Sequence, residues 1–425
     1  MASSKPETNT AVKLASTAEK PEIKTKIHFP AGFLLGAAAA AHQVEGDNSN
    51  SDWWAAEQKG LVPKSGMAAD HYHLFDQDFQ MAQDLGLNAM RISIEWARIE
   101  PEEGRWDSTA VEHYKKVLKS MKDHGLTRMV TLWHWTLPKW FADKGGFERK
   151  EGAEAFARFA WFVAQNLGQE IDLWVTLNEP ETFCQLGYDS GKFPPFKRSK
   201  FRYWKVLNNL IAAHKKSYKA IKSAFPQAQI GIAKNISYYE PYRKNNMLDR
   251  IVVFFADRIG NHYFYEKIQK HMDFVGLNYY FYNSVKFDFR HIYQEMNRNF
   301  IKGQLSLADQ ETRSDMGWFL HPEGIYHLLL ELNRYRLPIY ITENGLADAA
   351  DSRRPKYLRE TLEWVAKAIT AGANVKGYFH WSLTDNYEWA EGYGPRFGLV
   401  EIDYSSQKRT IRKSAAVLKE VAIDR

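Results

Sequence analysis

The chain has very little cysteine and no long apolar run. Cys184 is the only cysteine among 425 residues, so no disulfide can form within the chain. No stretch is apolar enough, for long enough, to span a bilayer, and we therefore expect no membrane partner. Residues 1–26 are rich in Ser, Thr, Lys, Glu and Pro and lack the apolar core of a secretory signal. We expect a disordered tail over 1–26 and a cytoplasmic protein.

Signals for nucleic acids, nucleotide cofactors and metals are also weak. The net charge of +6 is modest, and no basic cluster with interleaved aromatics points to nucleic acid. Gly392-x-Gly394 is not followed by a helix that could receive a phosphate. His71 and His73 form a His-x-His pair, but they open a predicted helix rather than close the first strand, which disfavours a metal site. We expect no cofactor and no metal, and leave a homo-oligomer open.

An alternation of two patterns fills the chain from Ile27 onward. The first pattern is a short apolar run rich in β-branched residues, and the chain has eight of them: FLLGAAAA, NAMRISIEW, TRMVTLWHW, LWVTLNEP, AQIGIAKN, DFVGLNYYF, LPIYITENG and VKGYFHWSL. The second pattern is an amphipathic segment with helical spacing, which lies between these runs. Several of the helical segments end at a glycine such as Gly86, Gly125 or Gly372. Near-continuous apolar strands separated by helices predict a parallel sheet that helices cover.

The number and order of the runs favour an α/β fold of the (β/α)8 TIM-barrel type. The competing arrangement, a doubly wound open sheet, usually has a glycine-rich phosphate turn after its first strand. Here the first run leads into Ala39-Ala40-Ala41-His42-Gln43 instead. We therefore predict a single catalytic barrel domain over residues 27–425.

A barrel predicts that chemistry lies at the carboxyl ends of its strands. Those ends carry carboxylates, amides and indoles, among them Glu179 after the fourth run and Glu343 after the seventh. Two carboxylates that face each other across a barrel mouth are what glycoside hydrolysis needs. The high aromatic content of 14% fits a site on which sugar rings stack, although aromatic rings also fill cores.

Four segments carry a resemblance to a known family. TLNEP and ITENG, with FLLGAAAAAHQVEG near the start and HWSLTDNYEWAEGY near the end, resemble glycoside hydrolase family 1, the β-glucosidases and their relatives. The resemblance covers Ile27 to the C-terminus. It implies a retaining β-glycosidase with Glu179 as acid/base and Glu343 as nucleophile, whose carboxyl groups should lie ~5–5.5 Å apart.

The same resemblance extends to the residues around the pair. Arg91 and Tyr280 match the family residues that contact the nucleophile. The implied sugar-binding set is Gln43, His134, Trp135, Asn178, Asn278, Trp318, Trp381, Glu388, Trp389 and Phe397. Trp381 matches the aromatic floor under the sugar ring, Asn178 the ligand of the 2-hydroxyl, and Trp318 an aglycone-side platform.

Glu388 indicates whether the sugar of the substrate carries a phosphate. Members of the family that act on 6-phosphorylated sugars have small and basic residues at this place, whereas a carboxylate would repel a phosphate dianion. We therefore expect a small, non-phosphorylated β-glycoside or short oligosaccharide, with a terminal glucosyl, or else a galactosyl or fucosyl, residue.

The sequence departs from the family at three places. Thr136 stands where an acidic residue is usual, and His42 stands where an aromatic residue is common. The segment between the helix at 249–268 and the sixth strand is short, so we expect a helix or its preceding loop to be missing from the barrel wall. We hypothesise that this flank is thinner, mobile or covered by another subunit.

Two other function classes stay open at this point. A catalytically silent glycan-binding barrel would keep the aromatics but should lack one of the two carboxylates. A retaining barrel hydrolase of another family, such as an endo-cellulase, would share the glutamate pair but should lack the set formed by Gln43, Glu388 and Trp389.

Overall fold

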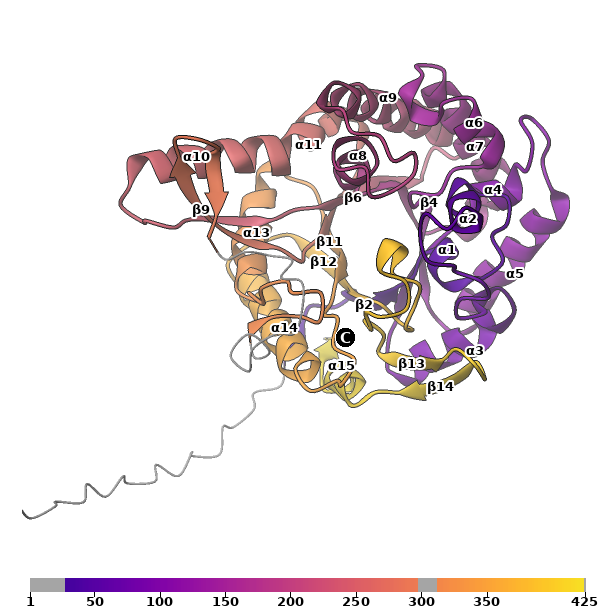
Figure 1. The fold of residues 1–425 in the computed structure, drawn as a ribbon. Coiled ribbons are helices and arrows are strands. Elements are labelled where there is room, and N and C mark those ends of the chain that lie inside the picture. Colours follow the sequence, from indigo (N-terminus) through magenta and orange to yellow (C-terminus); the bar gives the residue numbers. More distant parts are fainter. Residues whose placement is uncertain (1–26, 297–311, 424–425) are drawn as a thin grey trace, which may run out of the picture.

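All eight predicted runs form strands, and these strands pair in parallel to close a barrel (Figure 1). The computed structural model describes residues 27–296 and 312–423. Each barrel strand pairs with its neighbours along the chain, and the last strand pairs with the first from Gly377 opposite Leu34 to Trp381 opposite Ala38. The barrel strands are β2 (Leu34–Ala38), β3 (Ala89–Ser93), β4 (Thr127–Trp133), β5 (Leu173–Asn178), β6 (Gln229–Asn235), β8 (Val275–Asn278), β11 (Ile339–Asn344) and β12 (Val375–Trp381). The predicted (β/α)8 barrel is confirmed.

The strands are apolar along their whole length because both of their faces are covered. Every residue of β3 and of β5 is buried. One face points into the barrel and the other packs against the surrounding helices, which is the burial expected of a parallel sheet.

A ring of helices surrounds the barrel (Figure 1). The helix that precedes β4 shows how the sequence builds them. The Asp107 side chain accepts hydrogen bonds from the backbone N–H groups of Thr109 and Ala110, a cap that contributes about 1 kcal/mol. The helix buries Val111, Tyr114, Leu118 and Met121 and is followed by Gly125 with a φ of +70°. The covering helices are α3 (His71–Asp84), α5 (Ser108–Asp123), α7 (Gly152–Leu167), α9 (Lys200–Ala224), α11 (Tyr263–Ile268), α13 (Gly324–Leu332), α14 (Arg354–Thr370) and α15 (Ala416–Lys419).

Shorter elements follow the barrel strands or join the covering helices. The short helices are α1 (Ala41–Val44), α2 (Asp52–Gln58), α4 (Trp96–Ile99), α6 (Lys139–Asp143) and α8 (Pro180–Cys184). Turns of 3-10 helix lie at Gly146–Glu148, Gly168–Glu170, Gln269–His271, Asn333–Tyr335, Trp389–Glu391 and Lys413–Ala415, and π-helical turns at Gln185–Asp189 and Arg258–His262. Two small sheets pair β1 (His28–Phe29) with β15 (Ala422–Ile423) and β13 (Val400–Asp403) with β14 (Lys408–Ile411).

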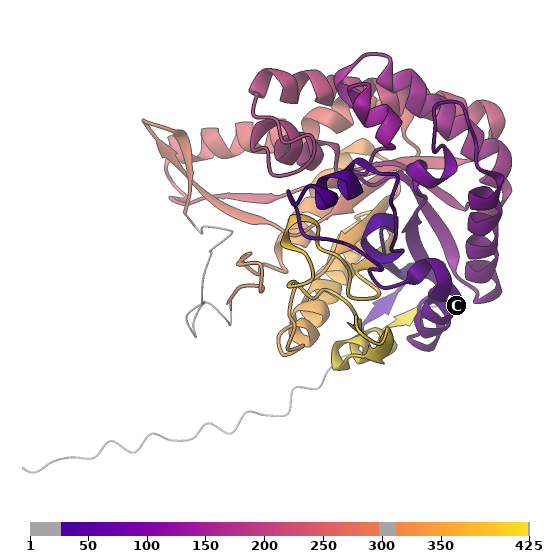
Figure 2. The same cartoon turned by 45° about the vertical axis from the view of Figure 1, so that its right-hand side comes forward.

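A three-stranded sheet and a helix extend one side of the barrel. The strands are β7 (Tyr238–Pro241), β9 (Tyr282–Asp288) and β10 (Ile292–Glu295), in the order β10-β9-β7. Helix α10 (Met247–Asp257) packs on this sheet and continues through a π-helical turn into α11. Figures 1 and 2 both show α10 and the β9–β10 hairpin projecting at the left-hand edge of the molecule.

This side is the flank on which the sequence suggested a missing helix. The predicted helix at 249–268 corresponds to α10, the π-helical turn and α11, and α11 buries Phe264, Tyr265 and Ile268. Only the 3-10 turn Gln269–His271 lies between this helix and β8, so the connection is as short as the sequence indicated. That the flank is mobile or covered by another subunit stays a hypothesis.

Two further expectations concern the N-terminal tail and the membrane. The predicted disordered tail, residues 1–26, lies outside the described residues, so the domain division at residue 27 stays a prediction. In residues 27–296 and 312–423, no helix combines the length and the apolar character that crossing a membrane would require.

Candidate active site

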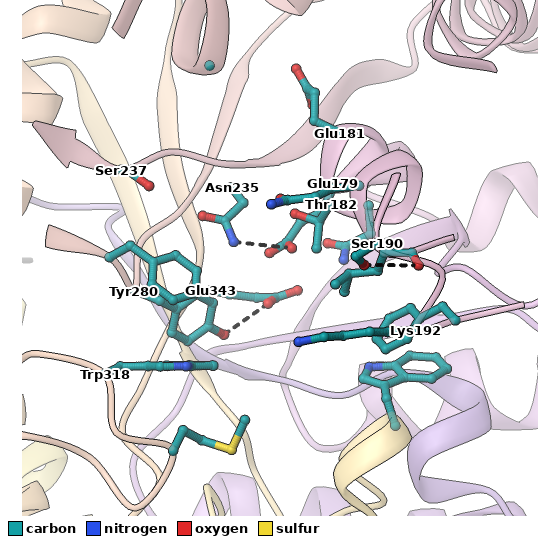
Figure 3. A pocket seen from close by; sticks show the side chains of 18 of the residues that line it. Glu179, Glu181, Thr182, Ser190, Lys192, Asn235, Ser237, Tyr280, Trp318 and Glu343 are labelled. Atoms are coloured by element: carbon teal, nitrogen blue, oxygen red, sulfur yellow. Dashed lines mark hydrogen bonds between the residues drawn. The ribbon is translucent and has the colours of Figure 1, made fainter. Parts of the chain in front are cut away.

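A cavity of about 580 Å³ opens where the barrel strands end (Figure 3). Of the residues predicted for the site, all but Arg91 and Asn278 line this cavity. Those two lie just behind its wall and contact the side chains that do. The structure therefore brings the whole predicted set together, from strands far apart in the sequence.

Glu343, the penultimate residue of β11, is held by two donors. Arg91 Nη1 donates to Oε1 at 2.5 Å, and the Tyr280 hydroxyl donates to Oε2 at 3.0 Å (Figure 3). Arg91 is itself buried and also bonds to the Thr342 carbonyl and to Thr131. A fixed positive charge and a hydroxyl donor favour the ionised form of Glu343.

Glu179 follows β5 in a different setting. Asn278 Nδ2 donates to its Oε1 at 2.7 Å and Asn235 Nδ2 to its Oε2 at 3.3 Å, and no cation pairs with it among the described residues. Its φ of +43° lies in the left-handed region, where a residue with a side chain is strained by roughly 1 kcal/mol or more. Pro180 then starts α8, and this sharp turn directs the Glu179 carboxyl into the cavity.

The two carboxyl groups have different pKa shifts. Burial, followed by the negative charge of Glu343, raises the pKa of Glu179 to about 7. Burial also raises the pKa of Glu343, but the Arg91 guanidinium and the hydrogen bonds from Arg91 and Tyr280 limit the rise. The pair is therefore arranged for one protonated and one ionised carboxyl near neutral pH.

Asn178 and His134 form a polar wall beside the pair. Asn178 Oδ1 accepts from Arg91 Nη2 at 2.8 Å and from Asn278 Nδ2 at 3.2 Å, and its Nδ2 donates to His134 Nε2 at 3.1 Å. Burial holds the pKa of His134 well below its usual range, so the ring is neutral and carries its proton on Nδ1. This Nδ1 is buried, lines the cavity, and has no partner in the described part of the chain.

Gln43 and Glu388 form the opposite wall. Gln43 Nε2 donates to Asn386 Oδ1 and to the Tyr387 carbonyl, at 3.1 and 2.9 Å, and lies 3.4 Å from Glu388 Oε2. Its Oε1 has no partner within residues 27–296 and 312–423. Buried polar atoms without partners are costly, so Gln43 Oε1 and His134 Nδ1 mark places where a ligand hydroxyl would be bound.

The charge on Glu388 differs from the sequence-based expectation. Burial, followed by the charges of Glu343 and Glu179, raises the pKa of Glu388 to about 8. In the free protein Glu388 is therefore largely neutral at pH 7 and can donate a hydrogen bond. The expectation of a non-phosphorylated sugar therefore loses its argument from a full negative charge at Glu388 and stays a prediction, since the basic side chain of Lys192 also lines the cavity.

Aromatic rings surround the polar groups. Trp389 packs on Trp135 with ring centroids 4.9 Å apart, and His134 stacks near Trp381 at 5.8 Å. On another side, Trp318 lies edge-on to Tyr280 at 5.5 Å and near Phe397 at 5.9 Å. The cavity thus combines apolar ring faces with a few directed polar groups, as expected for a sugar-binding site.

The structure adds residues that the sequence argument did not select. Asn235, the last residue of β6, donates to Glu179. Glu181 lines the cavity beyond Glu179 and pairs with the buried Lys234 at 3.0 Å. The strand-end position of Asn235 was a usable signal. Glu181 lies in the first turn of the short helix α8, after the strand end, where the sequence offers no comparable signal.

Two departures from the family have local explanations. The His42 ring stacks on Trp389 at 5.7 Å and contacts Glu57 Oε1 and Asn48 Nδ2, both at 3.1 Å, so it supports the aromatic wall from behind. The Thr136 hydroxyl donates to both oxygens of the buried Glu95, at 2.9 and 3.1 Å. An acidic residue at this position would face another carboxyl.

His71 and His73 do not converge on a common site. His71 Nδ1 bonds to Asp78 at 2.7 Å inside the protein, whereas His73 Nδ1 bonds to Asp70 at 2.6 Å at the surface. Each histidine has its own carboxylate partner, as structural histidines usually do.

Comparisons with known proteins agree with this geometry. The model of glycosyl hydrolase family 1 matches residues 25–265 and 261–425, two stretches that meet next to the short α11. The chain is 33% identical to beta-glucosidase A of Thermotoga maritima over 91% of this chain and 96% of that protein. It is 32% identical to a beta-galactosidase of Sulfolobus acidocaldarius over 93% of this chain and 95% of that protein. The solved structure of a beta-glycosidase from Pyrococcus horikoshii superposes with a TM-score of 0.85 at 38% identity, covering 93% and 95% of the two chains.

The paired carboxyls in a closed barrel and the extent of these matches lead to one conclusion. The chain belongs to glycosyl hydrolase family 1 and is a retaining β-glycosidase.

Proposed function

We propose that this β-glycosidase removes terminal, non-reducing β-D-glucosyl residues, with Glu343 as nucleophile and Glu179 as acid/base. The observation that carries this proposal is the unequal environment of the two carboxyls. Arg91 and Tyr280 donate to Glu343, whereas Glu179 has only neutral hydrogen-bond donors among the described residues and a pKa of about 7.

In the first half-reaction a Glu343 oxygen forms a bond to the anomeric carbon. The bond from that carbon to the aglycone oxygen breaks, and this oxygen takes the proton of Glu179. The expected separation of ~5–5.5 Å between the carboxyl groups, which leaves no room for an intervening water, stays a prediction.

In the second half-reaction Glu179 acts as a base. Once Glu343 is an ester it no longer carries a negative charge, so the second-largest cause of the raised Glu179 pKa disappears. The pKa of Glu179 then falls and its carboxylate takes a proton from the water that attacks the ester. One residue can serve both steps because the charge of its neighbour is removed between them.

We infer that the sugar lies between the two polar walls. His134 Nδ1 and Gln43 Oε1 offer one donor and one acceptor to its hydroxyls, Glu388 offers a further donor, and Asn178 holds the 2-hydroxyl. Trp381 supports the ring face and Trp318 the aglycone side. Relatives named as a glucosidase and a galactosidase support a terminal glucosyl residue and, as a second candidate, a galactosyl residue.

A panel of aryl β-glycosides tests the assignment. We expect hydrolysis of the glucoside, and Glu343→Gly should abolish it while leaving the circular dichroism spectrum unchanged. Glu179→Gln should lower turnover by about 10²–10⁴ for an aryl group that needs a proton on leaving. Turnover of no β-glycoside by the unaltered chain, or normal activity of the Glu343 variant, would contradict the proposal.

Two expectations about the whole protein stay proposals. We propose a cytoplasmic location, which fractionation of the source cells would check. A homo-oligomer is also a proposal, and light scattering of the full chain measures it directly.

A further inference from the structure

Helix α10 turns an apolar stripe to the outside. It packs on the small sheet through Asp249 and Val252, the residues of the helix that are buried. Exposed apolar residues recur on its other side and into the following turn at the spacing of a helix face: Met247, Leu248, Ile251, Phe254, Phe255 and Ile259. Phe254 and Phe255 are 60% and 55% exposed. A surface helix normally shows polar residues to solvent, so this face is inverted.

The neighbouring hairpin extends the same apolar surface. Phe289 and Ile292, at the turn between β9 and β10, are 91% and 72% exposed. We call the exposed face of α10 and this turn the outer face. In Figures 1 and 2 it lies where the molecule projects farthest at the left. A contiguous exposed apolar surface of this kind marks a contact with a partner.

The charges of the outer face point to an anionic partner. Arg250, Lys286 and Arg290 have no ion-pair partner in the described part of the chain. Of the carboxylates nearby, only Asp249 is paired with a guanidinium, that of Arg243, whereas Asp288 bonds to His291 and Glu295 accepts from the neutral Tyr293 hydroxyl. The three cations outnumber these two carboxylates, and anionic lipid headgroups would neutralise the excess positive charge.

The outer face is continuous with the cavity. Ile259, at the end of the apolar stripe, and Tyr293, on β10, both line the cavity that holds Glu179 and Glu343, and each is about half exposed. A chain attached to the aglycone oxygen can therefore leave the cavity beside Ile259 toward the outer face.

We propose that the outer face docks on an anionic lipid bilayer and presents the cavity to β-glycosides whose apolar aglycones are embedded in it. Aromatic and aliphatic side chains would enter the headgroup layer, and the three free cations would lie among the headgroups. Such docking needs no spanning helix. The docking stands alone, while the choice of substrate rests on the proposed function.

The test is binding of the full chain to vesicles of phosphatidylcholine and phosphatidylglycerol in equal amounts, measured by co-sedimentation. We expect binding that falls as salt rises, and weak binding to pure phosphatidylcholine. Phe254→Ser with Phe255→Ser should weaken binding by roughly tenfold, because two apolar rings no longer enter the bilayer.

A matched double variant, Trp161→Ser with Ile411→Ser, removes two exposed apolar side chains from other faces and should bind like the unaltered chain. Neither double variant touches the cavity, so both should hydrolyse a soluble aryl β-glucoside at the unaltered rate. A long-chain alkyl β-glucoside held in the vesicles should be hydrolysed more slowly only by the Phe254/Phe255 variant.

Three results would contradict the proposed docking surface. The first is that the chain does not bind vesicles, and the second is that both double variants lose vesicle binding equally. The third is that the unaltered chain is a dimer and binds no vesicles, while the Phe254/Phe255 variant is a monomer. In the last case a second copy of the chain covers the outer face. Vesicle binding without hydrolysis of any β-glycoside in solution would refute the proposed function and leave the docking surface standing.

Discussion

At the scale of single residues, the proposed acid/base role of Glu179 predicts how activity depends on pH. Its pKa of about 7 keeps the carboxyl protonated below neutrality, and the proton is lost as the pH rises through that value. Because the proposed first step consumes this proton, kcat/KM for a nitrophenyl β-glucoside should fall above about pH 7.

A dinitrophenyl glucoside provides the control for this pH dependence. Its aryl group leaves without a proton, so kcat/KM for it should show no alkaline decline, because kcat/KM reports only on the first step. The same decline for both substrates would mean that the ionisation at pH 7 belongs to another group.

The Thr136 hydroxyl shows how a departure from the family is accommodated. It donates to both oxygens of the buried Glu95, so Thr136→Val would leave that carboxyl without these two bonds. We expect a loss of about 1–3 kcal/mol in the free energy of unfolding, measured by urea denaturation. Thr136→Ser keeps the hydroxyl and should lose much less. Equal stabilities of the Val variant and the unaltered chain would show that Glu95 finds other donors.

Sequence reasoning at the residue scale succeeded wherever a side chain stands at a strand end. Glu179, Glu343 and His134 were selected for that position, and all line the cavity. It failed where the environment decides a property. The raised pKa of Glu388 depends on its burial and then on two other carboxyls that lie more than forty residues away along the chain, and the fold produces both effects.

At the scale of elements, close contact between strands closes the barrel. Gly276 on β8 lies against β6 so tightly that an added Cβ would stand 2.2 Å from the Ile232 carbonyl oxygen. This atom belongs to the backbone of a paired strand and cannot move aside. Gly276→Ala should therefore cost at least about 3 kcal/mol of unfolding free energy, or prevent folding.

Gly168→Ala is the matched control for that substitution. Its added Cβ would meet the Phe225 and Trp174 rings at ordinary distances of 3.5 and 3.8 Å, so stability should change by less than about 1 kcal/mol. Thermal unfolding of the two variants measures the difference. A Gly276 variant as stable as the Gly168 variant would mean that β6 and β8 are packed less closely than described.

The barrel strands were predictable because burial on both faces gives each of them a continuous apolar run. The small sheet of β7, β9 and β10 was not predicted. Its strands are mostly half-buried, and β9 pairs in parallel with β7 from more than forty residues away. Neither a burial pattern nor a hairpin turn in the sequence points to that pairing.

At the scale of the whole molecule, the barrel brings together the two carboxyls of the proposed catalytic pair from the ends of its fourth and seventh strands. Strand order alone places Glu179 and Glu343 at the same end, so the site follows from the fold class once the strands are recognised. The outer face does not follow in this way. The sequence indicated that this flank is unusual, but which side of α10 faces outward depends on how the helix packs on the small sheet.

The central claim is that Glu343 forms a covalent bond to the sugar, and trapping that bond tests it most directly. A 2-deoxy-2-fluoro-β-glucoside with a good leaving group should inactivate the enzyme and raise its intact mass by a single fluoroglucosyl group. Peptide mapping should then place the label on Glu343, within ITENG. Normal turnover of an aryl β-glucoside with a label on any other residue, or with no label at all, would contradict the account.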